Sequence, residues 1–284
     1  MIPAAFDYAR ARSMQDALKA LGTKGTKVVC GGQSLIPLLR FRLAEPKRLI
    51  DIAGLAQLRG VGRVKGGLRI GAATTYRELL DAKAARADFP LLAEVTEHIG
   101  DRQVRNLGTI GGGLVHADPA ADMPAAMLAL DATFAVQSAR GKRTVAARAF
   151  FHGPFATALK PQELLVEIRL PALPKGAGTA YVSFEQAASG YALVGAAAVV
   201  ARSNGTVSHA ALAFTGLADA PFLAQAAAEL VGTKGEANAV ARAAAAAVNG
   251  VDANEDIHAS AEYRTHLAQV AARRALTRAI ERAG

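Results

Sequence analysis

Two glycine-rich clusters constrain the fold more than any other feature of this sequence. The first is Cys30-Gly31-Gly32-Gln33-Ser34, which ends a strand-like run and leads at once into residues with helical spacing. The second is Thr109-Ile110-Gly111-Gly112-Gly113, which also follows a strand-like run. Glycine has no Cβ and tolerates positive φ, so consecutive glycines let backbone amides converge on one point. Each cluster therefore predicts a turn that can bind an oxyanion.

Neighbouring features strengthen this interpretation. The hydroxyls of Ser34 and Thr109 lie beside the turns, and the helix after the first turn would add its N-terminal amides and dipole. Together the two turns could hold both phosphates of a dinucleotide. The alternative is that the glycines only reverse the chain. Neither cluster is a G-x-G-x-x-G fingerprint and no Gly-Lys-Ser/Thr occurs, so the sequence excludes a Rossmann dinucleotide site and a P-loop.

Composition excludes several other classes. The 284 residues suffice for two domains, and the formal net charge of +9 suits an anionic cofactor or an acidic partner. A single cysteine rules out a disulfide framework and any iron–sulfur cluster held by this chain alone, which favours a cytoplasmic protein. Aromatic residues make up 5% and no arginine-rich block occurs, so nucleic-acid binding is not expected. No leader and no apolar run of about 18 residues is present, so membrane insertion is not expected either.

Local patterns divide the chain into two predicted domains. Residues 1–55 read as strands and helices, with Ser13 placed to cap a helix, and residues 56–175 read as an antiparallel sheet with inserted helices. Two prolines and a glycine in residues 171–176 predict a boundary. Residues 177–284 then read as strands followed by helices, the last of them capped by Ser260. The expected class is α+β, with a first domain of two parts, residues 1–55 and 56–175.

Four motifs carry a resemblance to a known family. They are Phe6-Asp7-Tyr8; Gly31-Gly32-Gln33-Ser34-Leu35; Arg105-Asn106-x-Gly108-Thr109-Ile110-Gly111-Gly112; and His116-Ala117-Asp118-Pro119-Ala120-Ala121-Asp122. Two more, Ser189-Gly190-Tyr191 and Ser260-Ala261-Glu262-Tyr263-Arg264, extend it through the second domain. The chain resembles the FAD-binding medium subunit of molybdenum hydroxylases, the carbon monoxide dehydrogenase and xanthine dehydrogenase family.

This resemblance implies a vanillyl-alcohol-oxidase-type FAD-binding domain in residues 1–175 and a C-terminal flavoprotein domain in residues 177–284. It implies that the FAD diphosphate lies on the two turns, that Asp122 lies near the ribose or adenine, and that Leu165 and Tyr191 approach the cofactor. The implied cofactor-binding residues are Cys30, Gly31, Gly32, Gln33, Ser34, Leu35, Thr109, Ile110, Gly111, Gly112, Gly113, Asp122, Leu165 and Tyr191. No catalytic residue and no metal ligand is expected on this chain.

Several of these residues have a simpler interpretation. Asp122 precedes Met-Pro and a helical run, so it could be a helix N-cap. Leu165 could be a core residue and Tyr191 an ordinary buried tyrosine. Two residues depart from the family pattern: Glu185 stands where relatives have a basic residue near adenine, and Gly113 replaces a bulkier polar residue.

The resemblance predicts an electron-transfer subunit. A large molybdenum–pterin subunit and a small subunit with two 2Fe-2S clusters would be its partners, in a dimer of heterotrimers, and FAD would pass electrons to an external acceptor. The alternatives are a self-contained flavin oxidase, in which substrate reduces FAD between the two domains, and a non-enzymatic binding module with purely structural glycines.

Overall fold

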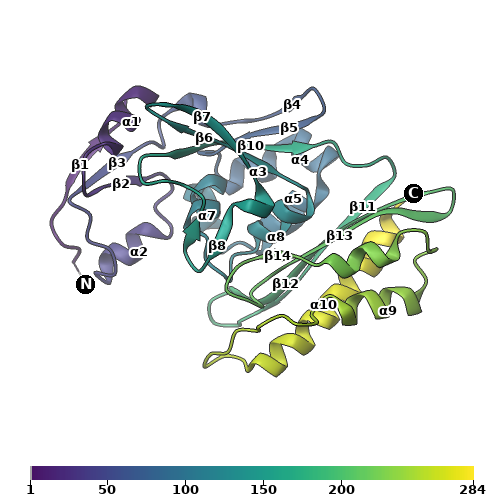
Figure 1. Ribbon diagram of the computed structural model, residues 1–284. Coiled ribbons are helices and arrows are strands. Elements are labelled where there is room, and N and C mark those ends of the chain that lie inside the picture. Colours follow the sequence, from purple (N-terminus) through teal and green to yellow (C-terminus); the bar gives the residue numbers. More distant parts are fainter. Residues whose placement is uncertain (1) are drawn as a thin grey trace.

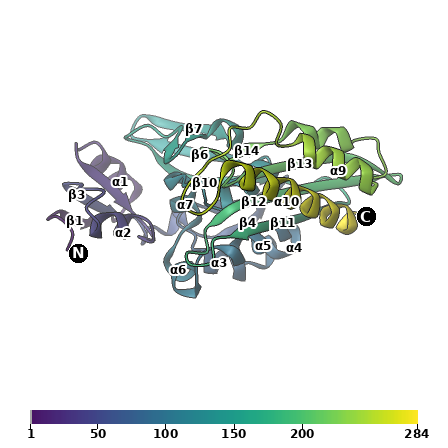
Figure 2. The same ribbon diagram turned by 90° about the horizontal axis from the view of Figure 1, so that it is seen from below.

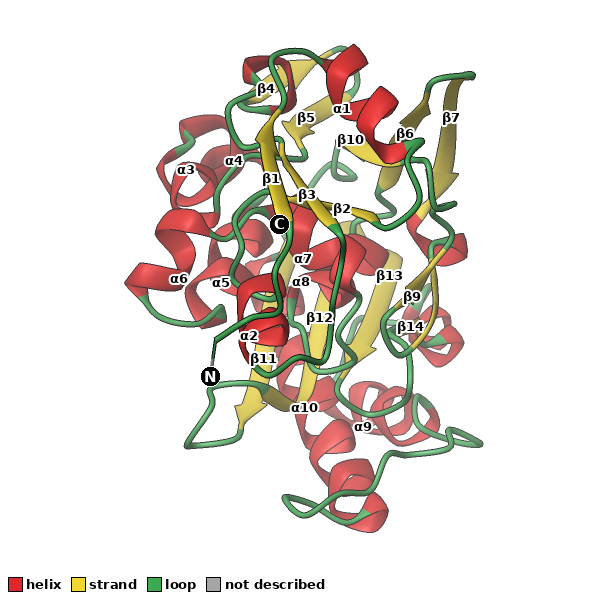
Figure 3. Cartoon of the chain, turned by 90° about the vertical axis from the view of Figure 1, so that its left-hand side faces the viewer, coloured by secondary structure: helices red, strands yellow, loops and turns green. Residues whose placement is uncertain are grey.

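The first subdomain is a small parallel sheet with two crossover helices. The computed structural model describes residues 2–284, and its first three strands pair in the order β1-β3-β2, both pairs parallel. The elements are β1 (Asp7–Arg10), α1 (Met14–Leu21), β2 (Thr26–Val29), α2 (Leu35–Arg40) and β3 (Arg48–Asp51). As expected, Ser13 caps α1, accepting a hydrogen bond from the Asp16 amide at 3.1 Å. This unit is purple in Figure 1 and lies in front in Figure 3.

The second subdomain is a five-stranded antiparallel sheet in the order β4-β5-β10-β6-β7. Its strands are β4 (Val61–Val64), β5 (Gly67–Gly71), β6 (Thr133–Ser138), β7 (Gly141–Ala146) and β10 (Leu164–Pro171). Between β5 and β6 the chain forms α3 (Tyr76–Asp81), α4 (Lys83–Asp88), α5 (Pro90–His98), α6 (Arg102–Leu107), α7 (Ile110–His116) and α8 (Met123–Ala129). Short pieces complete it: η1 (Ala56–Leu58), η2 (Ala147–Ala149), β8 (Phe151–Gly153) and β9 (Ala156–Thr157).

Alternating apolar residues explain how this sheet and its helices form one core. Ile70, Phe134 and Ile168 are fully buried on their strands and belong to the same cluster as the apolar residues of α5 and α8. Because side chains on a strand alternate between two faces, one face of the sheet carries this apolar set. The helices pack on that face, which fixes the position of α7 and its glycines.

The C-terminal domain is an antiparallel sheet covered by helices. Its sheet has the order β11-β12-β13-β14. The elements are β11 (Ala177–Glu185), β12 (Ala192–Ser203), β13 (Thr206–Thr215), β14 (Phe222–Leu223), η3 (Gln225–Leu230), α9 (Ala237–Ala246) and α10 (Ala261–Arg282). Figure 2 shows α10 lying along β11 and β12. Gly178 permits this close approach, because a Cβ there would lie 2.1 Å from the carbonyl oxygen of Ala279.

The opposite face of this sheet packs on the first domain. Tyr181, Val199 and Ala213 are buried in the same cluster as α5 and α8. The Thr215 hydroxyl also donates to the carbonyl oxygens of Pro119 (2.9 Å) and Ala121 (2.7 Å), which fixes the loop before α8. The expected α+β class with antiparallel sheets is confirmed. Within residues 2–284, no helix is both long enough and apolar enough to cross a bilayer.

Candidate cofactor site

The two glycine turns lie directly against each other. A Cβ built at Gly31 would lie 2.2 Å from the carbonyl oxygen of Leu107 and 2.8 Å from Cα of Gly108, the residue that precedes Thr109. Real side-chain atoms do not approach a carbonyl this closely, so only glycine allows this contact. Residues 75 and 109 also form an antiparallel bridge, which ties the second turn to the start of α3. The fold thus brings together two segments about 78 residues apart in the sequence.

The first turn presents free amides. Gly32 has a φ of +73°, and the Gln33 side chain donates to the Gly31 carbonyl at 3.1 Å, which closes the turn. Among the described residues, the amides of positions 31–34 donate to no other group, and the Ser34 hydroxyl caps no amide. All four residues are partly exposed. Adjacent free amides in a turn are typical of an anion-binding nest.

The second turn is different: the prediction that its converging amides can bind an oxyanion is wrong for residues 110–113, whose amides are already hydrogen-bonded. The amide of Ile110 donates to Thr74 O (3.0 Å) and that of Gly111 to Ala72 O (2.9 Å). The amide of Gly112 donates to the Thr109 hydroxyl (3.2 Å), so Thr109 caps α7. Positive φ is not the reason for these glycines either, since none of residues 111–113 adopts it. This turn can border an anion held by the first turn, but the amides of residues 110–113 already have partners.

Close packing explains two glycines of the second turn. A Cβ at Gly111 would lie 2.5 Å from Ala72 O, and one at Gly113 would lie 2.2 Å from the Tyr76 hydroxyl oxygen. Gly113 therefore makes room for a buried tyrosine that the sequence did not point to. Burial, then the nearby Asp122 and Tyr191, raise the pKa of Tyr76.

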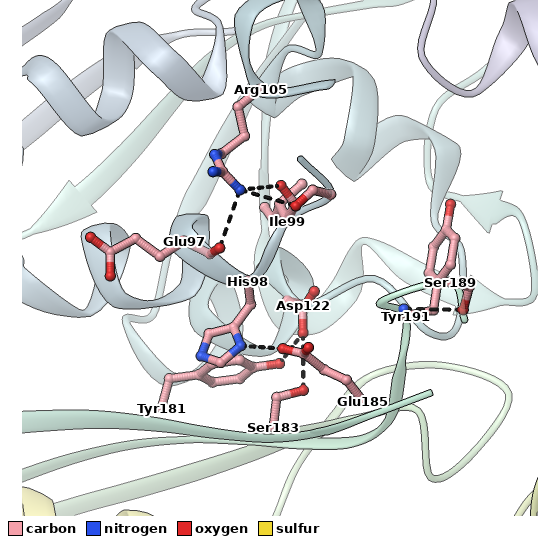
Figure 4. Close-up of polar contacts among 11 residues, drawn as sticks. Glu97, His98, Ile99, Arg105, Asp122, Tyr181, Ser183, Glu185, Ser189 and Tyr191 are labelled. Carbon is pink, nitrogen blue, oxygen red and sulfur yellow. Dashed lines mark hydrogen bonds and ion pairs between the residues drawn. The ribbon is translucent and has the colours of Figure 1, made fainter. Parts of the chain in front are cut away.

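Asp122 is not a helix cap. It occupies the N-cap position of α8, but its side chain accepts no amide hydrogen bond there. Instead, its Oδ1 accepts a 2.6 Å hydrogen bond from the Tyr181 hydroxyl and a longer one, 3.5 Å, from the Ser183 hydroxyl (Figure 4). Burial raises the pKa of Asp122 to about 6, and the Tyr181 hydrogen bond opposes that rise. The carboxyl group thus joins the first domain to β11 of the second.

A second polar pair lies beside the first. His98, at the end of α5, pairs through Nδ1 with Oε1 of Glu185 on β11, and its ring packs edge-on against Tyr181 with centroids 5.3 Å apart (Figure 4). Glu185, which departs from the family pattern, therefore takes part in a contact between the domains. Sequence reasoning missed His98 and Tyr181. No local pattern marks either residue, and the only signal for Tyr181 is that tyrosine occurs just five times in the chain.

The remaining two predicted residues have different environments. Tyr191 is 48% exposed, so the alternative of a buried tyrosine is wrong. Burial of part of its ring, with Asp118 and Asp122 nearby, raises the pKa of its hydroxyl. Leu165 is 5% exposed and belongs to the core of the second subdomain, as its simpler interpretation expected. A role of Leu165 in cofactor binding stays a prediction.

Known proteins identify the family. The model described as the FAD binding domain in molybdopterin dehydrogenase matches residues 4–173, and the C-terminal domain of the carbon monoxide dehydrogenase flavoprotein matches residues 179–279. The chain belongs to this flavoprotein family. It is the FAD-binding medium subunit of a molybdenum hydroxylase, an oxidoreductase, and FAD is its cofactor. The free amides beside Gly31 fit the diphosphate of that cofactor.

Individual relatives match almost the whole medium subunit. The carbon monoxide dehydrogenase medium chain of Hydrogenophaga pseudoflava is 38% identical over 282 residues, 98% of each chain. The solved carbon monoxide dehydrogenase structure from that organism superposes with a TM-score of 0.97 over 100% of both chains, at 39% identity. Quinoline 2-oxidoreductase from Pseudomonas putida 86 superposes with a TM-score of 0.94 over 99% of both chains, at 33% identity.

Cys30 provides a test of how the turns pack. Its thiol is partly buried beside Thr109, and burial raises its pKa. Because the thiolate is the reactive form, we expect iodoacetamide at pH 7.5 to alkylate Cys30 at least about tenfold more slowly than free cysteine. Bound FAD should slow the reaction further. The measurement is mass spectrometry of the alkylated peptide over time, with the urea-unfolded chain as control. Alkylation at the rate of the unfolded chain would show that the two turns separate in solution.

Proposed function

We propose that the first glycine turn binds the FAD diphosphate through the amides of residues 31–34 and that the second turn, residues 109–113, forms the adjoining wall. The observation that carries this proposal is the row of four free amides in residues 31–34, in a turn whose Gly31 packs against the Leu107 carbonyl. Asp122 and Tyr191 would complete the site from the domain interface. Leu35 would contribute the first amide of α2, and Cys30 and Gln33 would shape the turn.

We further propose that FAD in this subunit relays electrons. FAD supplies the redox chemistry, because it can accept electrons one at a time and pass on two. Electrons would come from iron–sulfur clusters of a small partner subunit, reduced by a large molybdenum–pterin subunit, and would leave to an external acceptor. The single cysteine supports placing the iron–sulfur clusters on another subunit, since this chain alone cannot ligate a cluster. A dimer of heterotrimers in the cytoplasm is the assembly we propose, in keeping with the low cysteine content.

The chain's own residues bind and enclose the cofactor. The amides of the first turn hold the phosphates, the packed second turn excludes water on one side, and the C-terminal domain closes another side through β11. No group of three His, Cys, Asp or Glu residues suited to a metal ion occurs in residues 2–284. We propose that the substrate of the complex is transformed on another subunit.

Anaerobic stopped-flow spectroscopy tests the proposal. The FAD-loaded chain is mixed either with a chemically reduced two-cluster iron–sulfur subunit or with organic substrates such as aldehydes, purines and N-heteroaromatics. Bleaching of the flavin absorbance by the reduced iron–sulfur subunit alone is the expected result. Rapid bleaching by an organic substrate would instead establish a self-contained flavin oxidase. A chain that does not bind FAD would refute both functions.

A further inference from the structure

The end of α2 exposes a group of apolar side chains. Fourteen large apolar side chains of residues 2–284 are exposed, and six of them lie within the first 43 positions: Ile2, Phe6, Tyr8, Ile36, Phe41 and Leu43. Phe41 is 64% exposed and Leu43 is 74% exposed, with only one residue between them. Single exposed apolar side chains are common on protein surfaces, whereas a group of them indicates a contact site.

A fixed turn presents these two side chains. α2 ends in a Schellman motif, in which the Arg42 amide donates to Leu39 O at 3.1 Å. The Leu43 amide donates to Leu38 O at 2.9 Å. The left-handed residue of such a motif is usually glycine, but here it is Arg42, with a φ of +56°. A side chain at this φ costs conformational energy. Arg42 Nε also donates to Ile2 O at 3.3 Å, which brings Ile2 to the same place.

Positive charge surrounds this apolar surface. Residues 2–55 contain nine Lys or Arg residues and four Asp or Glu residues, so they hold +5 of the formal charge of +9. Arg40 and Arg42 form no ion pair with any carboxylate of residues 2–284. We call Ile2, Arg40, Phe41, Arg42 and Leu43 the Phe41 patch. An apolar centre with unpaired cations at its rim fits a partner surface that has an apolar pocket edged by carboxylates.

The subdomain around the Phe41 patch leaves room for a partner. Within α2, Leu39 alone is buried, so the helix rests on the chain along a narrow strip. All four residues of the edge strand β1 are exposed as well. Parallel sheets are normally covered on both faces, and an open edge strand is normally protected. Figures 1 and 2 show α2 at the end of the molecule opposite α9, where a second protein can approach it.

α2 connects the Phe41 patch to the proposed cofactor turn. The helix begins at Leu35, directly after the turn, and its six residues rise about 9 Å. Electron transfer slows steeply with distance, so the protein that reduces FAD must lie close to the turn that binds it. We propose that the Phe41 patch is the docking surface for the small iron–sulfur subunit, which would contribute an apolar pocket edged by carboxylates. This inference rests on the proposed function.

Binding of the FAD-loaded chain to the two-cluster iron–sulfur subunit tests this inference. Phe41→Asp and Leu43→Asp should each weaken binding at least about tenfold, because each removes an apolar contact and places a carboxylate against carboxylates. Arg40→Glu should also weaken binding, and the affinity of this variant should fall less steeply as salt is added than that of the wild type. Biolayer interferometry measures the three affinities.

Two further variants separate docking from folding. Val231→Asp is the matched control, because Val231 is 49% exposed and follows η3, which packs on α9 at the opposite end of the molecule. It should leave the affinity for the iron–sulfur subunit unchanged. Arg42→Gly relieves the positive φ but removes a rim cation and the bond to Ile2. It should weaken docking without lowering the melting temperature, whereas unchanged docking would leave Arg42 outside the contact.

Flavin reduction gives a second readout. Dithionite should bleach the flavin of Phe41→Asp at the wild-type rate, because this variant leaves the cofactor turn intact. With the reduced iron–sulfur subunit as the reductant, the half-maximal rate should need at least about tenfold more subunit than in the wild type. Equal slowing with both reductants would mean that the substitution damages the flavin site, and it would overturn the docking role.

The remaining outcomes distinguish this inference from the proposed function. Wild-type affinity of Phe41→Asp and Leu43→Asp for the iron–sulfur subunit would overturn the inference, although the flavoprotein function would stand. Loss of self-association or of binding to the large subunit, with iron–sulfur subunit binding intact, would assign the patch to that other occupant. Failure of the wild-type chain to bind FAD or to accept electrons from the iron–sulfur subunit would instead refute the proposed function.

Discussion

Replacement of Gly31 by alanine is expected to lower FAD affinity at least about a hundredfold, which corresponds to about 2.7 kcal/mol of binding free energy. The new Cβ would lie 2.2 Å from the Leu107 carbonyl oxygen and 2.8 Å from Gly108 Cα, and both are backbone atoms that cannot rotate away. The two turns must therefore separate, and the row of free amides loses its geometry. Isothermal titration of the apoprotein with FAD measures the effect.

Gly62→Ala is the matched control for this experiment. Gly62 lies on β4 of the same domain, a Cβ there would meet no atom within 4 Å, and its φ is not positive. Its replacement should leave FAD affinity unchanged. Gly32→Ala should have an intermediate effect, since the φ of +73° strains alanine but the nearest atom is the movable end of the Ile36 side chain. Equal affinity of Gly31→Ala and wild type would contradict the assignment of the diphosphate to this turn.

The second large effect concerns the stability of the C-terminal domain. Arg264, on the first turn of α10, is 4% exposed and donates to Leu193 O (2.6 Å), Gly216 O (3.2 Å) and the Asp256 carboxylate (2.7 Å). Arg264→Met would remove the donor from one buried carbonyl, that of Gly216, and from the partly buried carbonyl of Leu193, so we expect a loss of about 3 kcal/mol in the free energy of unfolding. Urea denaturation followed by circular dichroism measures it.

Arg278→Met provides the comparison on the same helix. Arg278 lies on the exposed face of α10 and donates no hydrogen bond within the described residues. Its substitution should change the free energy of unfolding by less than about 0.5 kcal/mol. A similarly small change for Arg264→Met would mean that other contacts hold together the segments that Arg264 connects, which are those around Leu193, Gly216 and Asp256.

Local chemistry made much of the fold predictable. Ser13 and Ser260 cap helices where they were expected to. A serine directly before a stretch of helical periodicity can accept a hydrogen bond from a free amide of the first helical turn. The antiparallel sheet with inserted helices that was expected in residues 56–175 is present as β4, β5, β6, β7 and β10. The close packing of the two turns was beyond local patterns, since it depends on a backbone contact between Gly31 and Leu107 that neither segment encodes alone.

The candidate site was predictable only in part. The sequence does not distinguish the two glycine clusters. The three-dimensional structure shows that the carbonyl oxygens of Ala72 and Thr74 accept hydrogen bonds from amides of the second cluster. The sequence offered two interpretations of Asp122, a cofactor contact and a helix N-cap. The N-cap is wrong because the carboxyl accepts a hydrogen bond from Tyr181 of the other domain, whereas the cofactor contact stays a prediction. Contacts of this kind are set by tertiary packing, which overrides a local capping signal.

The loop of residues 118–122 limits how relatives can be recombined. The Gly216 amide and the Thr215 hydroxyl both bond to the Pro119 carbonyl, and Tyr181 bonds to Asp122. A chimaera made by joining two homologues near residue 175 would pair this loop with a foreign sheet. Exchangeable modules in enzyme engineering should therefore carry residues 118–122 together with the C-terminal half, although the sequence separates them by more than 50 positions.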